Sequence, residues 1–235
     1  MISENLKIVR GRIEEAARRA FRPRPCMQER GRRADDIILV CVTKTVAAPQ
    51  IEEALAAGVA DIGESRIQEA EVKFKAIGPR ARWHLIGHLQ TNKVKDAVRI
   101  FDLIHSVDSL KLAEEISGRA GVFGKTQEIL IEVKTSEEAA KYGVPPEEVF
   151  DLVEKAAVLP HIKIMGLMTM APLVPDPQEA RPYFKRLREL SEAIASRKMA
   201  NVNMRYLSMG MTQDFEAAIE EGANMVRIGH AIFEG

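Results

Sequence analysis

Residues 204–230 read MRYLSMGMTQDFEAAIEEGANMVRIGH, and this stretch decides the fold class. Two short apolar runs, Met204–Ser208 and Met225–Ile228, flank a segment, Phe215–Glu221, whose apolar residues recur at three-to-four spacing. Short apolar runs are typical of strands, and three-to-four spacing is typical of an amphipathic helix. The stretch therefore predicts a strand, a glycine turn, a helix and a second strand.

The same alternation continues toward the N-terminus. Six more strand-like runs precede this stretch, at Ile37–Val42, Val59–Ile62, Arg82–Ile86, Phe101–His105, Glu128–Val133 and Ile162–Met168. Helical spacing marks the segments between them, at Pro49–Ala57, Arg66–Ala76, Leu110–Ala120, Pro146–Ala157 and Gln178–Arg197. Eight such repeats favour an α/β fold, a (β/α)₈ TIM-type barrel of parallel strands with helices outside. A doubly wound open sheet is the alternative, and the count of eight favours closure.

An extra helix is predicted before the first strand, over residues 3–20 within the N-terminal segment 1–20, with Ser3 as its N-cap. We expect it to cover the barrel where a helix after the eighth strand would otherwise lie. Residues 21–35 are rich in Pro and Arg and are predicted to form a connector. No composition shift divides the chain, so residues 1–235 are predicted to form a single barrel domain.

The composition excludes several classes of protein. Lys plus Arg and Asp plus Glu both number 34 among 235 residues, so the chain has no net charge that would favour nucleic acid or a membrane surface. No apolar run is long enough to cross a bilayer. With only Cys26 and Cys41, the chain is not expected to have a disulfide framework. We therefore expect a cytoplasmic location. His84 and His88 lack the further ligands that a metal site needs.

Lys44 directly follows the first strand-like run, at the C-terminal end of the strands where active sites of these barrels lie. Side chains alternate along a strand, so Lys44 shares a face with Val42, Val40 and Ile38. If that face lines the barrel interior, we expect the amine to be partly withdrawn from water; a solvent-exposed lysine at the strand end is the equal alternative. A neutral amine there can attack an aldehyde to form a Schiff base.

Two glycine turns follow the last two strands. Ser208 and Gly210 come after the seventh run, and Gly229 comes after the eighth. Backbone N–H groups of such turns bind anions, and this fold often binds phosphate after its seventh and eighth strands. Arg227, on the last strand, can only donate hydrogen bonds, so beside a pyridine nitrogen it would keep that nitrogen unprotonated. A phosphate site with a lysine suits either pyridoxal phosphate or a sugar phosphate.

At this point the motifs resemble those of a known family. VTKT, IGESRIQEA, WHLIGHLQTNKVK, IHSVDS, KYGV, GLMTMAP, LSMGMTQDFEAAIEEGANMVRIG and AIF occur in that order from about Val40 to Phe233. Together they resemble the pyridoxal phosphate homeostasis proteins, which are related to the barrel domain of alanine racemase. The combination is specific, although no single motif is.

The resemblance implies that pyridoxal 5′-phosphate (PLP) is the cofactor and that Lys44 carries it as an internal aldimine. It places Arg227 beside the pyridine nitrogen and Met168 near the ring. It assigns the phosphate to residues of the last two turns, which are Ser208, Gly210, Met211, Gly229 and His230. The chain departs from the family pattern at three positions, because Ser65, Lys134 and His230 stand where Asn, a small polar residue and Thr are common.

The resemblance also implies a PLP-binding protein that supplies apo-enzymes rather than an efficient enzyme. An amino-acid racemase of low activity is the alternative, and a cofactor-free aldolase using Lys44 is a third. Racemisation needs two bases, one on each face of the cofactor. Alanine racemases take the second from a tyrosine of a C-terminal domain, whereas this sequence ends at Gly235 directly after the predicted barrel. A monomer is expected, because no partner-supplied base is needed.

Overall fold

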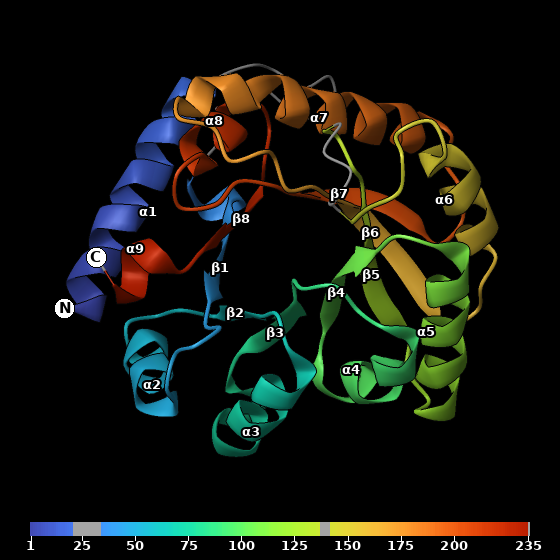
Figure 1. The fold of residues 1–235 in the computed structure, drawn as a ribbon, viewed down its shortest axis with the longest axis horizontal. Helices are drawn as coiled ribbons and strands as arrows, with labels where there is room; N and C mark the ends of the chain where they lie inside the picture. Colours follow the sequence, from blue (N-terminus) through green and yellow to red (C-terminus); the bar gives the residue numbers. More distant parts are fainter. Residues whose placement is uncertain (21–33, 137–141, 235) are drawn as a thin grey trace.

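The eight predicted strands form one closed parallel barrel in the computed structural model, which describes residues 1–20, 34–136 and 142–234 (Figure 1). The strands follow chain order around the barrel, and the last pairs with the first to close it. They are β1 (Ile38–Val42), β2 (Asp61–Glu64), β3 (Arg82–Leu85), β4 (Leu103–Val107), β5 (Gln127–Glu132), β6 (Ile162–Met168), β7 (Val202–Ser208) and β8 (Met225–Ile228). The barrel is therefore confirmed over the open sheet.

The helices lie outside the barrel, as Figure 1 shows. The α-helices are α1 (Ile2–Arg19), α2 (Ala48–Ala56), α3 (Ile67–Ile77), α4 (Val94–Ile100), α5 (Leu110–Val122), α6 (Val149–Ala157), α7 (Arg181–Ser196), α8 (Phe215–Glu220) and α9 (His230–Phe233). Short 3₁₀ turns are η1 (Ala34–Asp36), η2 (Gly78–Arg80), η3 (Thr91–Lys93) and η4 (Pro177–Ala180). Among the described residues, no helix has the length and apolar composition needed to span a membrane.

Alternation along the strands separates two buried cores. Apolar side chains on the outer face of the strands pack against the helices, as Cys41, Trp83 and Ile104 do. The inner face carries a smaller apolar cluster of Val40, Leu103, Leu130, Met165, Met168, Tyr206 and Met225. A residue two positions away from one of these along the same regular strand therefore also points into the barrel.

The N-terminal helix fills the gap beside the last strand. α1 packs against α8 and α9, its Leu6, Val9 and Ile13 are buried, and Arg12 Nε donates to Glu216 at 2.7 Å. The N-terminal helix thus lies at the place where a helix after β8 would otherwise cover the barrel. The prediction that Ser3 caps this helix is wrong, because the helix already includes Ile2 and no side chain caps its start.

Other differences from the sequence predictions are small. β2 lies two residues beyond the predicted Val59–Ile62, because Glu64 is buried with an ion-pair partner and can occupy a strand. The sequence prediction missed α4, although buried Val94, Ala97 and Val98 have helical spacing. Most of the predicted connector, residues 21–33, lies outside the described residues, and its last two residues belong to η1.

Candidate functional site

Lys44 lies in the turn that directly follows β1, at the C-terminal mouth of the barrel. Ile38 and Val40 belong to the inner face of the strand, so alternation places Lys44 on the inward side as well. The side chain is exposed, and no described residue hydrogen bonds to its amine. The expectation of partial withdrawal from water is therefore wrong for this structure, while the expected position at the mouth is the observed one.

A buried ion pair braces this turn from the outside of the barrel. Thr43 points away from the interior, and its hydroxyl donates to Glu64 Oε1 at 2.6 Å. Lys73 Nζ donates both to the same carboxylate oxygen and to the Thr43 carbonyl, each at 2.7 Å. Because these partners come from β2 and α3, the backbone before Lys44 is held by two neighbouring elements.

The turn after β8 lies directly against the end of β1. A Cβ atom built on Gly229 would be 2.8 Å from the Val42 carbonyl oxygen, which is closer than real Cβ contacts come. Only glycine lets the two backbones approach this closely. His230 follows, exposed, with its Nδ1 at 2.7 Å from Glu234 Oε2. Lys44 is two residues after Val42, so Gly229 and His230 lie beside the Lys44 turn.

The turn after β7 also needs a glycine. Gly210 has φ +95°, and a Cβ there would lie 2.7 Å from the Ala218 side chain. The Gly210 carbonyl accepts the Arg227 backbone N–H at 3.0 Å, which ties this turn to β8. The Met211 N–H, expected to face a phosphate, donates to Asp214 Oδ1 at 2.6 Å in this structure.

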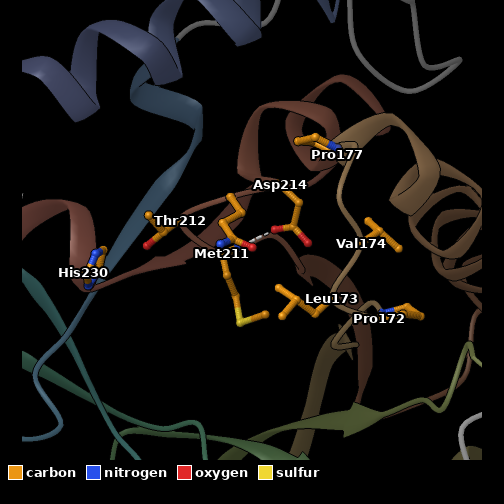
Figure 2. Close-up of a pocket in the computed structure, with 9 residues that line it drawn as sticks. Pro172, Leu173, Val174, Pro177, Met211, Thr212, Asp214 and His230 are labelled. Atoms are coloured by element: carbon orange, nitrogen blue, oxygen red, sulfur yellow. Dashed lines mark hydrogen bonds between the residues drawn. The ribbon is translucent and has the colours of Figure 1, made fainter.

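A pocket of about 380 Å³ opens beside these turns. Figure 2 shows Met211 and Thr212 between His230 on one side and Leu173 and Val174 on the other. Its lining residues are Pro172, Leu173, Val174, Pro177, Met211, Thr212, Gln213, Asp214 and His230. Of the segment after β6 that supplies the apolar wall, only Pro172 belongs to a quoted motif, and the sequence interpretation did not include Leu173, Val174 or Pro177.

Arg227 lies in the floor of the mouth, almost completely buried. Its Nη1 donates to Ser208 Oγ at 2.7 Å, and its Nη2 donates to the Thr169 carbonyl at 2.9 Å. Burial lowers the Arg227 pKa to about 10, against the raising effect of Asp214 and Glu132. The guanidinium is therefore still charged at neutral pH, with two of its five N–H donors committed to the protein.

Ser208 and Met168 also belong to the floor rather than to the rim. They are register partners on β7 and β6, and both are fully buried. The Ser208 hydroxyl contacts Arg227 and, at 3.0 Å, His105 Nδ1. In this structure it offers no surface to a ligand, so the hydroxyl–phosphate contact implied by the resemblance would need a rearrangement.

Polar residues to which sequence reasoning gave no role in the cofactor site extend below Ser208. His105 Nε2 lies 2.9 Å from His84 Nδ1, and His84 Nε2 lies 2.8 Å from Asp61 Oδ1. Burial lowers the His84 pKa and lowers the His105 pKa well below its usual value. Both imidazoles are therefore neutral at pH 7. The alternation of the strands was the signal available for these residues, because each occupies an inward position.

Glu132 ends β5 on the inward side, in register with Met168. It is 3% exposed, and no described side chain or backbone N–H pairs with its carboxyl group. Burial, together with the nearby charge of Asp108, raises its pKa to about 7, while Arg227 opposes this shift. A carboxyl group that titrates near neutrality therefore lies in the same floor as Arg227.

Three further residues, Tyr142, Ser65 and Lys134, lie around the rim. Tyr142 is exposed and stacks on His88, with ring centroids 3.9 Å apart. Ser65 is half-buried, and a Cβ on Gly87 would lie 2.3 Å from its carbonyl oxygen. Lys134 is half-buried after β5. Lys141 lies outside the described residues.

The site is thus a rim and a floor at one end of the barrel. Lys44, Gly229, His230 and Met211 form the rim, and Ser208, Met168 and Arg227 form the floor. The structure brings the predicted residues together over the neighbouring strands β1, β8, β7 and β6.

Comparison with known proteins defines the class of this barrel. Residues 27–235 match the family model described as alanine racemase, N-terminal domain. The match covers every rim and floor residue described above.

The individual relatives narrow this class. The chain is 42% identical over 231 residues to the pyridoxal phosphate homeostasis protein of Aquifex aeolicus, covering 98% of this chain and 96% of that protein. It is 38% identical to the protein of the same name from Pseudomonas aeruginosa, covering 99% and 94%. PipY of Synechococcus elongatus, solved with PLP bound, is 32% identical with a TM-score of 0.83, covering 99% and 100%. The chain belongs to the pyridoxal phosphate homeostasis protein family.

Proposed function

We propose that this chain binds PLP, holds the aldehyde carbon covalently on the Lys44 amine, and stores and delivers the cofactor to apo-enzymes that need it. The names of its relatives and the PLP-bound structure of PipY support the cofactor. The covalent link and the delivery role go further than those names, and they rest on the arrangement of the mouth.

One observation carries the proposal: the Lys44 turn and the Gly229 turn are in backbone contact. The close approach of Gly229 to Val42 places an exposed amine, which has no hydrogen-bond partner among the described residues, beside a glycine turn. PLP carries an aldehyde and a phosphate on one small ring. A ligand of this size can therefore reach Lys44 with one end and the rim at Gly229 with the other.

The residues present fit this group. Side chains at positions 210 and 229 would collide with Ala218 and with the Val42 carbonyl, so only glycines let the two turns take these positions. In the proposal, the Gly210–Met211 turn, Gly229 and His230 hold the phosphate. The exposed imidazole of His230 supplies a further donor if it turns from Glu234.

Arg227 and Met168 would contact the ring. Because a guanidinium has no acceptor, Arg227 can approach only an unprotonated ring nitrogen. Met168, fully buried, closes the floor with an apolar surface. PLP supplies a reactive aldehyde and an electron-withdrawing ring, and withholding the ring proton weakens that withdrawal. These residues therefore bind and orient the cofactor while restraining its chemistry.

A racemase of low activity is the second candidate, and Tyr142 is the observation that keeps it. Of the three tyrosines, Tyr206 lies inside the barrel near Arg82, and Tyr183 lies on α7 outside it. Tyr142 is at the mouth but stacked on His88. Because a second base has to face the cofactor ring, we propose that racemisation is not the main activity.

The test is an absorbance spectrum of the purified protein with PLP, followed by borohydride reduction and peptide mapping. We expect a visible band that disappears on reduction and a label on the peptide that contains Lys44. A label on another lysine would overturn the covalent assignment, and the absence of any visible band would favour a cofactor-free aldolase. Inversion of alanine at an enzyme-like rate would replace the carrier by a racemase.

The proposal also includes a cytoplasmic monomer. Cys41 is buried, and its burial raises its pKa to about 12, so this thiol is inert packing. Sedimentation of the PLP-loaded protein at several concentrations tests the monomer, and a mass of two chains would contradict it.

A further inference from the structure

Four buried side chains and the partly exposed Asp61 form a continuous line of hydrogen bonds through the barrel. Arg227 Nη1 donates to Ser208 Oγ at 2.7 Å, and Ser208 Oγ lies 3.0 Å from His105 Nδ1. His105 Nε2 lies 2.9 Å from His84 Nδ1, and His84 Nε2 lies 2.8 Å from Asp61 Oδ1. The line crosses the interior from β7 to β4, and then passes through β3 to β2. These five residues are called the relay below.

The relay runs from the floor of the mouth to the start of β2. Asp61 is the first residue of β2, whereas Ser208 is the last residue of β7. The three middle residues, Ser208, His105 and His84, have no exposed surface, while the Asp61 side chain is 18% exposed. One end therefore lies in the floor under the proposed cofactor, and the other lies within reach of solvent.

The two ends determine where each proton lies. A guanidinium can only donate, and a carboxylate can only accept. Ser208 accepts from Arg227, so its single proton is free to go to His105 Nδ1. At the other end, Asp61 requires a proton on His84 Nε2. With both rings neutral, each imidazole then accepts at Nδ1 and donates from Nε2, and every bond of the relay is satisfied.

The reverse arrangement leaves an unfavourable contact. If His105 donated from Nδ1 to Ser208 and both rings stayed neutral, His84 would face the Asp61 carboxylate with an unprotonated Nε2. A charged histidine would remove that conflict, but burial lowers the pKa of both rings. The forward direction, from Arg227 to Asp61, is therefore the favoured state.

We propose that His105, His84 and Asp61 are positioning residues that act through Ser208 to orient the Arg227 guanidinium toward the cofactor ring. A serine hydroxyl rotates freely unless an acceptor fixes its proton. His105 provides that acceptor and so turns a Ser208 lone pair toward Arg227. With Thr169 accepting from the other terminal nitrogen, the planar guanidinium is held between β7 and the end of β6.

The relay also assigns Ser208 a different task from a phosphate contact. One hydroxyl proton cannot serve both His105 and a phosphate oxygen. Ser208 then contributes to cofactor binding by orienting Arg227, while the backbone of the glycine turns takes the phosphate. This inference rests on the proposed PLP site for its consequence, but the proton arrangement itself is a property of the chain alone.

The first test measures the protons without any cofactor. Nitrogen-15 spectra of the imidazoles, recorded at pH 7, should show His84 and His105 neutral and protonated on Nε2, with slowly exchanging N–H protons. A proton on Nδ1 of either ring, or an imidazolium, would overturn the relay whether or not PLP binds.

The second test asks whether Asp61 acts at a distance on the bound cofactor. Asp61→Asn keeps the shape but adds a donor that can reverse the His84 tautomer. We expect a shifted visible band and PLP affinity weakened about three- to tenfold, with the reducible label still on Lys44. Tyr206→Phe is the matched control, because Tyr206 lies inside the barrel, where its hydroxyl accepts from Arg82, but outside the relay.

A double-variant cycle separates the relay from a general structural effect. In a Ser208→Ala background the line is cut, so Asp61→Asn should then change the band and the affinity by less than about twofold. An undiminished effect in that background would contradict action through Ser208. A label that no longer maps to Lys44 in the unaltered protein would instead contradict the proposed function, so the two failures are distinguishable.

Discussion

Gly229 lies against Val42 so closely that a Cβ atom at position 229 would be 2.8 Å from the Val42 carbonyl oxygen. This contact joins the last strand of the barrel to the first at the mouth. It is also what brings the Lys44 turn to the proposed phosphate turn, because Lys44 is two residues beyond Val42. A variant that separates these backbones should affect stability and ligand binding together.

Gly229→Ala should therefore destabilise the protein and weaken PLP binding. Relieving the contact requires a backbone shift, which costs roughly 1–3 kcal/mol of the free energy of unfolding. PLP affinity should fall at least tenfold or so, because the turn moves away from Lys44. Urea unfolding and PLP titration measure the two effects.

Gly118→Ala is the matched control. Gly118 lies in α5, and a Cβ there would meet no atom within 4 Å. It should stabilise the protein by about 0.5–1 kcal/mol through helix propensity and leave PLP affinity unchanged. Equal PLP affinity in both glycine variants would show that the Gly229 turn does not hold the ligand.

Lys44→Ala should abolish the reducible PLP label while leaving the fold intact. The side chain is exposed and makes no hydrogen bond with the described residues, so its removal should change the free energy of unfolding by less than about 0.5 kcal/mol. Mass spectrometry after borohydride treatment provides the measurement. Lys134→Ala, which removes another lysine after a strand end, should keep the label on Lys44. A full label on the Lys44 variant would refute the assignment.

Much of the fold could be predicted because its signals are local. The runs at Ile37–Val42 and Met225–Ile228 and the turns at Gly210 and Gly229 are each visible within a few residues. Lys44 could be placed at the mouth because it directly follows a strand. Alternation along that one strand was enough to place it on the inward side. Errors at boundaries, such as β2, came from polar residues like Glu64 that a tertiary partner makes acceptable in a strand.

The hydrogen bonds beneath the floor could not be predicted in the same way, although Ser208, Met168 and Arg227 were predicted site residues. Asp61, His84, His105, Ser208 and Arg227 come from five strands, and no local pattern says which inward polar side chains meet. His84 was considered only with its sequence neighbour His88, yet the two diverge, one into the interior and one to the rim. Which inward side chains meet across a closed barrel depends on the strand order and the register, and these are known only once the fold is known.

The buried histidines predict that the protein loses stability in mild acid. His84 and His105 have folded-state pKa values below their usual 6.5, so the unfolded chain binds more protons than the folded one once the pH falls below 6.5. Their contribution is therefore fully present above pH 6.5 and is lost as the pH falls. Each should add a slope of about 1.4 kcal/mol per pH unit.

Urea unfolding from pH 7 to pH 5 tests this, with His105→Gln as the variant. The variant should be less stable at pH 7 but show a shallower decline. If the His105 variant keeps the full slope, this histidine does not stay neutral in the folded state.

Glu132 should have the opposite dependence on pH. Its folded-state pKa is raised from 4.5 to about 7, mainly by burial, so the folded chain binds the extra proton between these values. Stability associated with this group is present below pH 4.5 and is lost as the pH rises through 7.

Glu132→Gln keeps the shape and removes the ionisation. In cofactor-free protein, the variant should gain roughly 1–3 kcal/mol over the unaltered chain between pH 5 and pH 8. Glu128→Gln, on the same face of β5 but paired with Arg82, should show no such gain, since its charge is compensated. If the Glu132 variant gains nothing, the carboxyl group ionises in the folded protein without cost, and burial beside Arg227 does not hold its proton.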